Sequence, residues 1–284
     1  MKKIYFLAII LISFSFKTFD STYHSLSGGS FTQNWSNAAL ITTTDVWTGV
    51  PSIQGFLGDD ASTTTAGIDP QTIVADFTTL DVIANQANPN TNATGGVAEF
   101  AITDPVVALQ GSGTADFPNI VIYLNTTGQT NIGVQYNLRD IDGSADNAIQ
   151  PVALQYRIGA TGNFTNIPAG FVADATTGPS LATLVTAVNV VLPVACENQS
   201  QVQLRIITSN AAGSDEWVGI DDISISSGAG PSNVISVAAG SNAAEPSTNG
   251  SFTVSFTPAT VAAATRFNYA LTGTATFNTD YSVT

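Results

Sequence analysis

The segment RDIDGSADN carries three carboxylates, at Asp140, Asp142 and Asp146, with Gly143 between them. Alternate residues of an extended loop can turn their carboxylates toward one ion, and Ca²⁺ takes only oxygen ligands. The spacing differs from that of an EF-hand, which needs Gly at its sixth position and Glu at its twelfth. A set of Asx turns joining two strands would use the same residues. The loop is therefore a candidate calcium site, with a purely structural turn as the alternative.

A second acidic cluster lies in SDEWVGIDDIS. On a regular strand Asp221 would share a face with Trp217, and Asp222 would take the opposite face. A carboxylate among apolar neighbours needs an arginine, hydrogen bonds or a metal ion to offset the cost of burial. Arg139 and Arg205 lie on predicted neighbouring strands and are candidate partners. Metal binding and ion pairing both remain open for Asp221 and Asp222.

Catalysis by the usual nucleophilic triads is nearly excluded by composition. The one histidine, His24, follows an N-terminal apolar segment and is expected outside the compact domain, yet Ser-His-Asp and Cys-His mechanisms require a positioned imidazole. A pair of carboxylates of the glycosidase type could be drawn from Glu99, Glu197 and Glu216, although no motif selects among them. We therefore expect no catalytic residue.

Aromatic side chains offer another chemistry, because exposed rings on a sheet can form a platform for sugars. Trp35, Trp47 and Trp217 are the candidates. Core packing is the commoner fate of tryptophan in strand patterns. A row of exposed rings on one face would favour carbohydrate binding, and buried tryptophans would remove the main support for it.

The net charge of the chain restricts the kinds of molecule that it can bind. The chain has 284 residues with 21 acids and a formal net charge of −14. The lysines all lie within the first 17 residues, so removal of that segment leaves four arginines against 21 acids, a formal charge of −17. Nucleic-acid binding depends on neutralising phosphates with Lys and Arg, so a nucleic-acid partner is excluded. Calcium is the natural counterpart of such a surface.

The N-terminus has the pattern of a secretory signal. Lys2 and Lys3 precede an apolar run from Ile4 to Phe16, which is shorter than the roughly 20 residues of a membrane-spanning helix. We predict a signal peptide over residues 1–20, and a membrane association only if that segment stays uncleaved. Cys196 is the one cysteine, so no disulfide forms within the chain, and we expect it in a loop or at a strand edge. A secreted or cell-surface bacterial protein fits this composition.

Period-two alternation predicts the elements that must position these residues. Apolar residues alternate with polar ones in NIGVQYNLRD, VALQYRIG and QVQLRII, which indicates half-buried antiparallel strands. Further strands are predicted in SFTQNW, VAEFAI, NIVIYLN, ATLVTAVNVVL and WVGIDDISIS. The fold class is all-β, with a jelly-roll-like sandwich over 28–227. A linker rich in Gly, Ser and Pro follows at 228–232, and a second β domain begins at 233.

The C-terminal part, 233–284, resembles the start of a Calx-beta domain. The resemblance rests on AAEPSTNGSFTVSF and on GTATFNTDYSV, where Asn278 stands in place of the usual Gly. It implies a seven-stranded, Ig-like sandwich of which only about half is present, so the sequence is expected to stop inside the domain. It also implies calcium ligands at Glu245 and Asp280.

The larger part resembles an exported jelly-roll domain of bacterial surface and secreted proteins. The resemblance rests on LRDIDGSADNAIQPVALQYRIG, FVADATTGPSLATLVT and DEWVGIDDISI. It implies the fold and the presence of further domains, and says little about a reaction. From the acidic composition and the two resemblances together we expect a non-catalytic protein that binds calcium and acts in adhesion or as an accessory module, with a glycan or a surface protein as its partner. The alternative is a carbohydrate-binding accessory region of a larger secreted hydrolase or nuclease.

Overall fold

The computed structural model describes residues 22–59, 66–92, 94–144, 147–176, 182–228, 234–241 and 250–257. The chain divides into two units, Met1–Gly230 and Pro231–Thr284. The division falls within the segment 228–232 that the sequence analysis interprets as a linker. The predicted signal, residues 1–20, lies outside the described residues.

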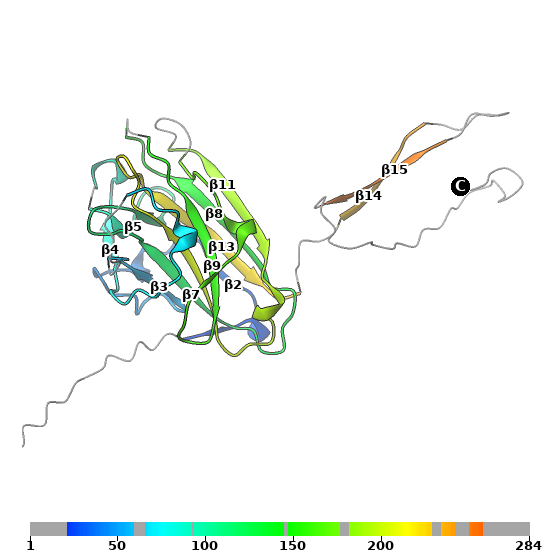
Figure 1. Ribbon diagram of the computed structural model, residues 1–284, viewed down its shortest axis with the longest axis horizontal. Coiled ribbons are helices and arrows are strands. Elements are labelled where there is room, and N and C mark those ends of the chain that lie inside the picture. The colour runs from blue at the N-terminus through cyan, green and yellow to red at the C-terminus, as the bar shows by residue number, and fades with distance from the viewer. Residues whose placement is uncertain are drawn as a thin grey trace, which may run out of the picture. The chain divides into compact units, whose positions relative to one another are not determined.

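Two sheets pack face to face in the first unit (Figure 1). Sheet A has the order β1-β7-β12-β9-β10. β3 also pairs with β7, on the edge that β1 occupies and away from β12. Its strands are β1 (His24–Ser25), β3 (Ile53–Phe56), β7 (Asn119–Asn125), β9 (Val152–Ile158), β10 (Thr165–Asn166) and β12 (Val202–Thr208). The pairs of β7, β9 and β12 are antiparallel, so β12 lies between two antiparallel partners.

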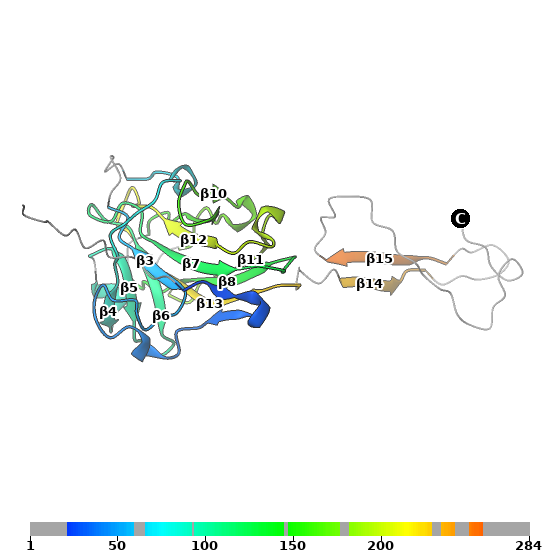
Figure 2. The same cartoon turned by 90° about the horizontal axis from the view of Figure 1, so that it is seen from below.

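Sheet B has the order β11-β8-β13-β6-β5-β4, with β2 paired to β13, and Figure 2 shows it below the strands of sheet A. Its strands are β2 (Phe31–Gln33), β4 (Ile83–Gln86), β5 (Gly96–Phe100), β6 (Val106–Gln110), β8 (Gly133–Asp140), β11 (Val185–Val191) and β13 (Val218–Ser226). The described helices are short 3-10 turns, namely η1 (Leu26–Gly28), η2 (Ala38–Leu40), η3 (Pro70–Thr72), η4 (Pro89–Thr91), η5 (Pro168–Gly170) and η6 (Val194–Cys196). In the described part of the chain no helix is long and apolar enough to span a bilayer.

The core fills the space between the sheets. Alternate residues of the strands supply it, for example Ile120, Ile122 and Leu124 from β7 and Leu138 from β8. Every segment that the alternation predicts as a strand contains one, so the all-β, jelly-roll-like class is confirmed. Inward positions of a regular strand repeat every two residues, as in β7, β8 and β12, whereas β6 contributes the consecutive residues Val106–Leu109 to this core.

A second apolar cluster lies on the outer face of sheet A and makes one expectation wrong. It combines outward residues of the sheet with side chains from the covering segment around 66–80: Phe56, Phe77, Phe117, Val121, Tyr123, Ala153, Phe164 and Ile207. The strands there were expected to be half-buried, but every residue of β12 is buried. The covering segment has no strand periodicity, so the alternation within β12 gives no sign of it.

Burial of this outer face requires that its polar side chains find partners inside the protein. Arg205, on β12, donates from Nη1 to the carbonyl of Ala75 at 2.6 Å and from Nη2 to the carbonyl of Ile73 at 2.5 Å. Its Nε donates to Gln155 Oε1 at 2.8 Å, and its guanidinium carbon lies 4.0 Å from the centre of the Phe164 ring. Desolvation lowers the pKa of Arg205 from 12.5 to about 9. The arginine therefore ties the covering segment to the sheet.

The second unit is described over two antiparallel strands, β14 (Val234–Ala239) and β15 (Phe252–Thr257). A strand pair agrees with the predicted β class. Glu245 and Asp280, the implied calcium ligands, lie outside the described residues. The Calx-beta assignment therefore stays a prediction.

We predict that Arg205→Lys lowers the free energy of unfolding by about 2 kcal/mol, measured by urea denaturation. An ammonium group is a compact donor and cannot reach both carbonyls and Gln155 together, so buried acceptors lose their partners. Arg139→Lys is the control, because Arg139 lies on sheet B and meets carboxylates that an ammonium group also satisfies. Equal losses in the two variants would contradict the role given to the guanidinium fork.

Candidate functional site

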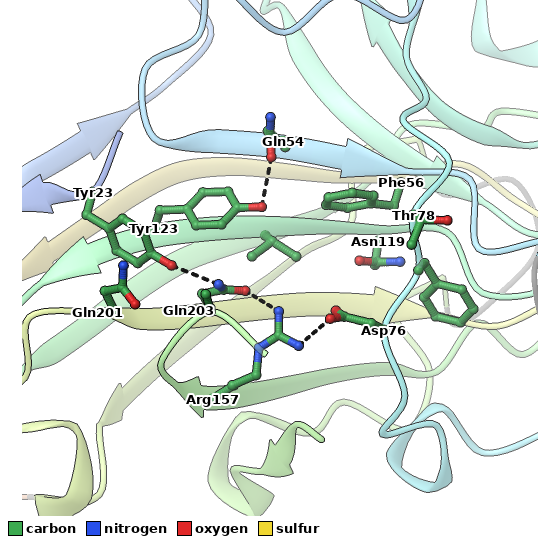
Figure 3. Close-up of a pocket in the computed structure, with 13 residues that line it drawn as sticks. Tyr23, Gln54, Phe56, Asp76, Thr78, Asn119, Tyr123, Arg157, Gln201 and Gln203 are labelled. Carbon is green, nitrogen blue, oxygen red and sulfur yellow. Dashed lines mark hydrogen bonds and ion pairs between the residues drawn. The ribbon is translucent and has the colours of Figure 1, made fainter. Parts of the chain in front are cut away.

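A groove of about 420 Å³ lies on the outer face of sheet A, beside the covering segment (Figure 3). It is lined by side chains from β3, β7, β9 and β12, together with residues before β1 and around 76–78. They are Tyr23, Gln54, Phe56, Asp76, Phe77, Thr78, Asn119, Val121, Tyr123, Arg157, Ala160, Gln201 and Gln203. The volume is within the range of small-molecule sites in proteins.

Strand register brings the floor of the groove together. Gln203 on β12 lies opposite Tyr123 on β7 and opposite Arg157 on β9, so the three form one row across the sheet. Cross-strand neighbours of this kind have Cβ atoms about 5 Å apart. The row points outward because the residues that flank Gln203, Val202 and Leu204, belong to the core.

Hydrogen bonds link the polar groups of the groove into a chain, which Figure 3 shows along the sheet. Gln203 Nε2 donates to the Tyr23 hydroxyl at 2.9 Å, and Gln203 Oε1 accepts from Arg157. Arg157 Nη1 pairs with the carboxylate of Asp76 on the covering segment. The network holds the amide and the guanidinium in place before any ligand arrives.

Two further side chains complete the groove wall. The Tyr123 hydroxyl donates to Gln54 Oε1 at 2.8 Å, and the Tyr123 ring meets that of Tyr23 edge-to-face with 5.4 Å between centroids. The side chain of Asp76 is 47% exposed, whereas that of Arg157 is 6% exposed. A ligand in the groove would thus meet aromatic edges, amides and a partly open carboxylate.

The structure brings Asp140, Asp142 and Glu216 close enough together, at one end of the sandwich, for the charge of one acid to raise the pKa of another. The pKa of Glu216 is raised from 4.5 to about 7, mainly by burial and in smaller part by the charges of Asp140 and Asp142. Burial also raises the pKa of Asp140 from 3.8 to about 6, with contributions from Asp142 and Asp174. We call Asp140, Asp142 and Glu216 the Asp140 cluster.

Partners inside the protein satisfy part of the Asp140 cluster. Asp140 Oδ1 accepts from the Asp142 amide at 3.2 Å, and Glu216 Oε1 accepts from the Ala148 amide at 2.8 Å. Asp140 Oδ2 is buried and meets no donor among the described residues. Within the same residues, no set of three or more Asp, Glu, His or Cys stands as a metal site. Asp146, the third predicted ligand of this loop, lies outside the described part.

The sequence left metal binding and pairing with protein groups open for Asp221 and Asp222, and in the structure both have partners within the protein. Asp221 is buried, and its Oδ2 lies 2.6 Å from Arg139 Nη1. Asp222 is exposed and accepts from Asn137 at 3.0 Å. The expectation of Arg205 as a partner is wrong, because Arg205 lies on sheet A and binds Gln155 and backbone carbonyls.

The expected division of β13 into two regular faces is also wrong beyond Asp221. The pairing of β13 with β8 shifts register between Asp221 and Ser224, and Asp222 has a φ of 49°. The bulge lets Ile220 and Ile223 both enter the core and turns Asp222 out to solvent. An extra residue at a bulge moves all later side chains to the other face.

The possibility that exposed tryptophans form a platform for sugars is wrong. Trp35, Trp47 and Trp217 are 2%, 4% and 0% exposed and belong to the core between the sheets. Each indole donates to a backbone carbonyl, of Ile220, Asp81 and Asn92 respectively.

The remaining singled-out residues take structural contacts. His24 lies in β1, inside the sandwich and not outside it as expected, and its Nε2 is 3.1 Å from the carbonyl oxygen of Gly29. Glu99 and Glu197 each accept from a backbone amide, of Asn85 and Asn131. Cys196 ends η6 as a free, buried thiol whose pKa burial raises to about 12.

Sequence reasoning missed the groove. Tyr123, Arg157 and Gln203 were visible as the polar or outward members of three alternating strands, and these are the strands that pair in sheet A. A comparison of outward positions across the three would have placed them in one row. Asp76 and Tyr23 carry no such signal, because neither lies in a strand.

No protein-family model matches this sequence, and no curated protein matches it. Among solved structures, it is similar to a carbohydrate-binding module specific for non-crystalline cellulose, CBM28, at 9% identity and a TM-score of 0.35, over 50% of this chain and 86% of that one. It is similar to TmCBM61 in complex with β-1,4-galactotriose at 16% identity and a TM-score of 0.28, over 49% and 77%. It is also similar to the K3 cleaved adhesin domain of Lys-gingipain from Porphyromonas gingivalis at 12% identity and a TM-score of 0.37, over 69% and 98%. Similarities at this level assign neither a family nor a ligand.

Proposed function

We propose that the first unit is a non-catalytic binding module that holds an oligosaccharide in the groove on sheet A. The observation that carries the proposal is the row of Tyr123, Gln203 and Arg157 at the base of an open groove. Binding sites for small ligands combine apolar walls with a few fixed polar groups. Aromatic rings pack on the apolar faces of sugar rings, and amides and carboxylates bind their hydroxyl groups.

The groove suits binding better than catalysis. Hydrolysis of a glycosidic bond takes two carboxyl groups on opposite sides of the bond. Among the described residues that line the groove, Asp76 is the one carboxylate, and it is paired with Arg157. Glu99, Glu197 and Glu216 do not line it. The acid pair that a hydrolase needs would have to come from another part of a larger protein.

An extracellular location follows from the same proposal. Lys2 and Lys3, followed by the apolar run, predict export, and glycans of the cell surface or of secreted polymers then become available. In this setting the module would serve adhesion, or would bring a larger secreted hydrolase or nuclease to its substrate.

The first test replaces two groove residues that lie outside the core between the sheets. We predict that Gln54→Ala and Tyr23→Ala each weaken the affinity for an oligosaccharide about tenfold, which is about 1.4 kcal/mol. Isothermal titration with neutral β-linked glucose, galactose and xylose oligomers would measure the affinities, and thermal melts would check that each variant folds.

Gln135→Ala is the matched control for this test, because Gln135 is an exposed glutamine on β8 of the opposite sheet. Its affinity should equal that of the unaltered protein. If no oligosaccharide binds, or if the control loses as much affinity as the groove variants, the glycan proposal fails.

A second candidate function, calcium binding, rests on a different observation. Asp140 Oδ2 is buried beside Asp142 and Glu216, and no described residue donates to it. A carboxylate in this position must either hold a proton or meet a cation, because an uncompensated buried charge is costly. We propose that Ca²⁺ binds Asp140 and Asp142, with Asp146 and Glu216 as further ligands, and stabilises the sandwich.

The raised pKa values determine the sign of a pH test. Asp140 and Glu216 titrate at 3.8 and 4.5 when unfolded, and at about 6 and about 7 in the fold. Between these values the folded protein holds more protons than the unfolded chain, so the free energy of unfolding falls as pH rises. In chelator, the melting temperature should therefore drop from about pH 5 to about pH 8.

Calcium should reverse this drop at about pH 8 and do little at about pH 5, because it competes with protons for the same oxygens. Glu216→Gln should flatten the pH dependence, whereas Asp104→Asn should not, because the side chain of Asp104 is 71% exposed. An identical melting profile with calcium and with chelator would show that the Asp140 cluster is structural only.

A further inference from the structure

We infer a second cation site, separate from the Asp140 cluster, in which Asp116 is the principal ligand. Asp116 directly precedes Phe117 at the entrance to β7 and is 2% exposed. Both of its carboxylate oxygens are buried, and neither meets a hydrogen-bond donor among the described residues. Native proteins rarely leave a buried carboxylate in this state, and each case calls for a missing partner.

A second carboxylate stands beside it. The Phe117 amide donates to the carbonyl of Gly58 at 3.2 Å, which continues the antiparallel pairing of β3 with β7 and brings the next residue, Asp59, alongside Asp116. Burial raises the pKa of Asp116, and the charge of Asp59 raises it further. Asp59 is exposed, so it marks the side from which an ion and its water ligands would enter.

The chain segments that border Asp116 hold two further buried oxygen atoms without a donor in the described part of the chain. On the other side of Asp116, the Asn210 amide donates to the Asp116 carbonyl at 2.8 Å, and Ser209, the residue before Asn210, has a buried hydroxyl. Gly111 packs so closely on this segment that a Cβ would lie 2.4 Å from Asn210 Cα, which brings the end of β6 and Gln110 to the same place. Ser209 Oγ and Gln110 Oε1 are both buried without a partner among the described residues.

We call Asp116 and Asp59 the Asp116 site. Asp116 contributes two buried carboxylate oxygens that no described residue matches with a donor or a cation, and Asp59 is a second carboxylate beside it. Oxygen-only sites with two carboxylates and neutral oxygens suit Ca²⁺, which tolerates irregular coordination and keeps water ligands. Mg²⁺ requires near-ideal octahedral geometry and fits less well.

The site would stabilise a junction of four segments. The ends of β6 and β12, the start of β7 and the chain after β3 meet there, and an ion would hold them from one point. A ligand that binds only the folded protein raises its melting temperature by an amount set by concentration over Kd. At about 100 times Kd, a unit of this size should gain about 5–10 °C.

The experiment compares Asp116→Asn, Asp140→Asn and the unaltered full chain, titrated with CaCl₂ by calorimetry and followed by thermal melts. We expect Asp116→Asn to lose one Ca²⁺ binding event and its share of the melting shift, while Asp140→Asn keeps that event. Asp104→Asn, which removes one exposed charge, should bind as the unaltered protein does. Failure of the Asp140 cluster to bind calcium would leave this outcome unchanged, so the two proposals are tested separately.

The inference is overturned if Asp116→Asn binds Ca²⁺ with the same stoichiometry and melting shift as the unaltered protein. If Asp116→Asn does not fold, Asp59→Asn takes its place, because Asp59 is exposed and the variant should weaken this binding event about tenfold. A crystal grown in CaCl₂ gives a direct readout, in which an anomalous peak beside Asp116 supports the site and a water molecule or a protonated carboxyl there excludes it.

Discussion

The structure depends on how the outward face of sheet A is buried. β12 is the central strand of its sheet and is enclosed on both sides, yet its outward residues include Gln203 and Arg205. Both side chains are at most 3% exposed, so their polar groups must find partners within the protein. The carbonyls of Ile73 and Ala75 on the covering segment accept from Arg205. Gln203 donates to Tyr23 and accepts from Arg157, which in turn pairs with Asp76 of the covering segment. The path of the covering segment is thus determined by hydrogen bonds to two strands.

This constraint also explains why a groove exists on that face. Phe77 and Phe164 close the apolar cluster over Arg205, and the row of Tyr123, Gln203 and Arg157 lines the groove on the same face. Polar side chains at the border of a cover can be held by the network on one side and face a ligand on the other. The same hydrogen bonds that fix the covering segment therefore preorganise the groove, which reduces the cost of ordering side chains on binding.

The sequence predicted the strands well and the outer layer poorly, for a physical reason. Alternation reports which residues of β8, β9 and β12 point inward, and those predictions were confirmed except at Ile158, the exposed last residue of β9. It says nothing about what covers the other face, because the cover at 66–80 carries only turn signals such as Pro70. The groove joins residues as distant as Tyr23 and Gln203, 180 positions apart, and only the completed fold brings them together. The bulge at Asp222 was not predicted for a similar reason, because the alternation of apolar and polar residues does not report a residue with positive φ.

The distribution of the arginines connects these observations to the acids. In the part of the chain that the structure describes, Arg139 pairs with Asp221 and Asp104. Arg157 pairs with Asp76, and Arg205 donates to backbone carbonyls. Each arginine acts within a sheet face, and among the described residues none of the three forms an ion pair with Asp140, Asp142, Glu216 or Asp116. Protons can neutralise such carboxylates only below their raised pKa values, which for Asp140 and Glu216 are about 6 and about 7. Above that range these carboxylates carry charge that no arginine of the described residues matches, which is the physical basis of the calcium proposals.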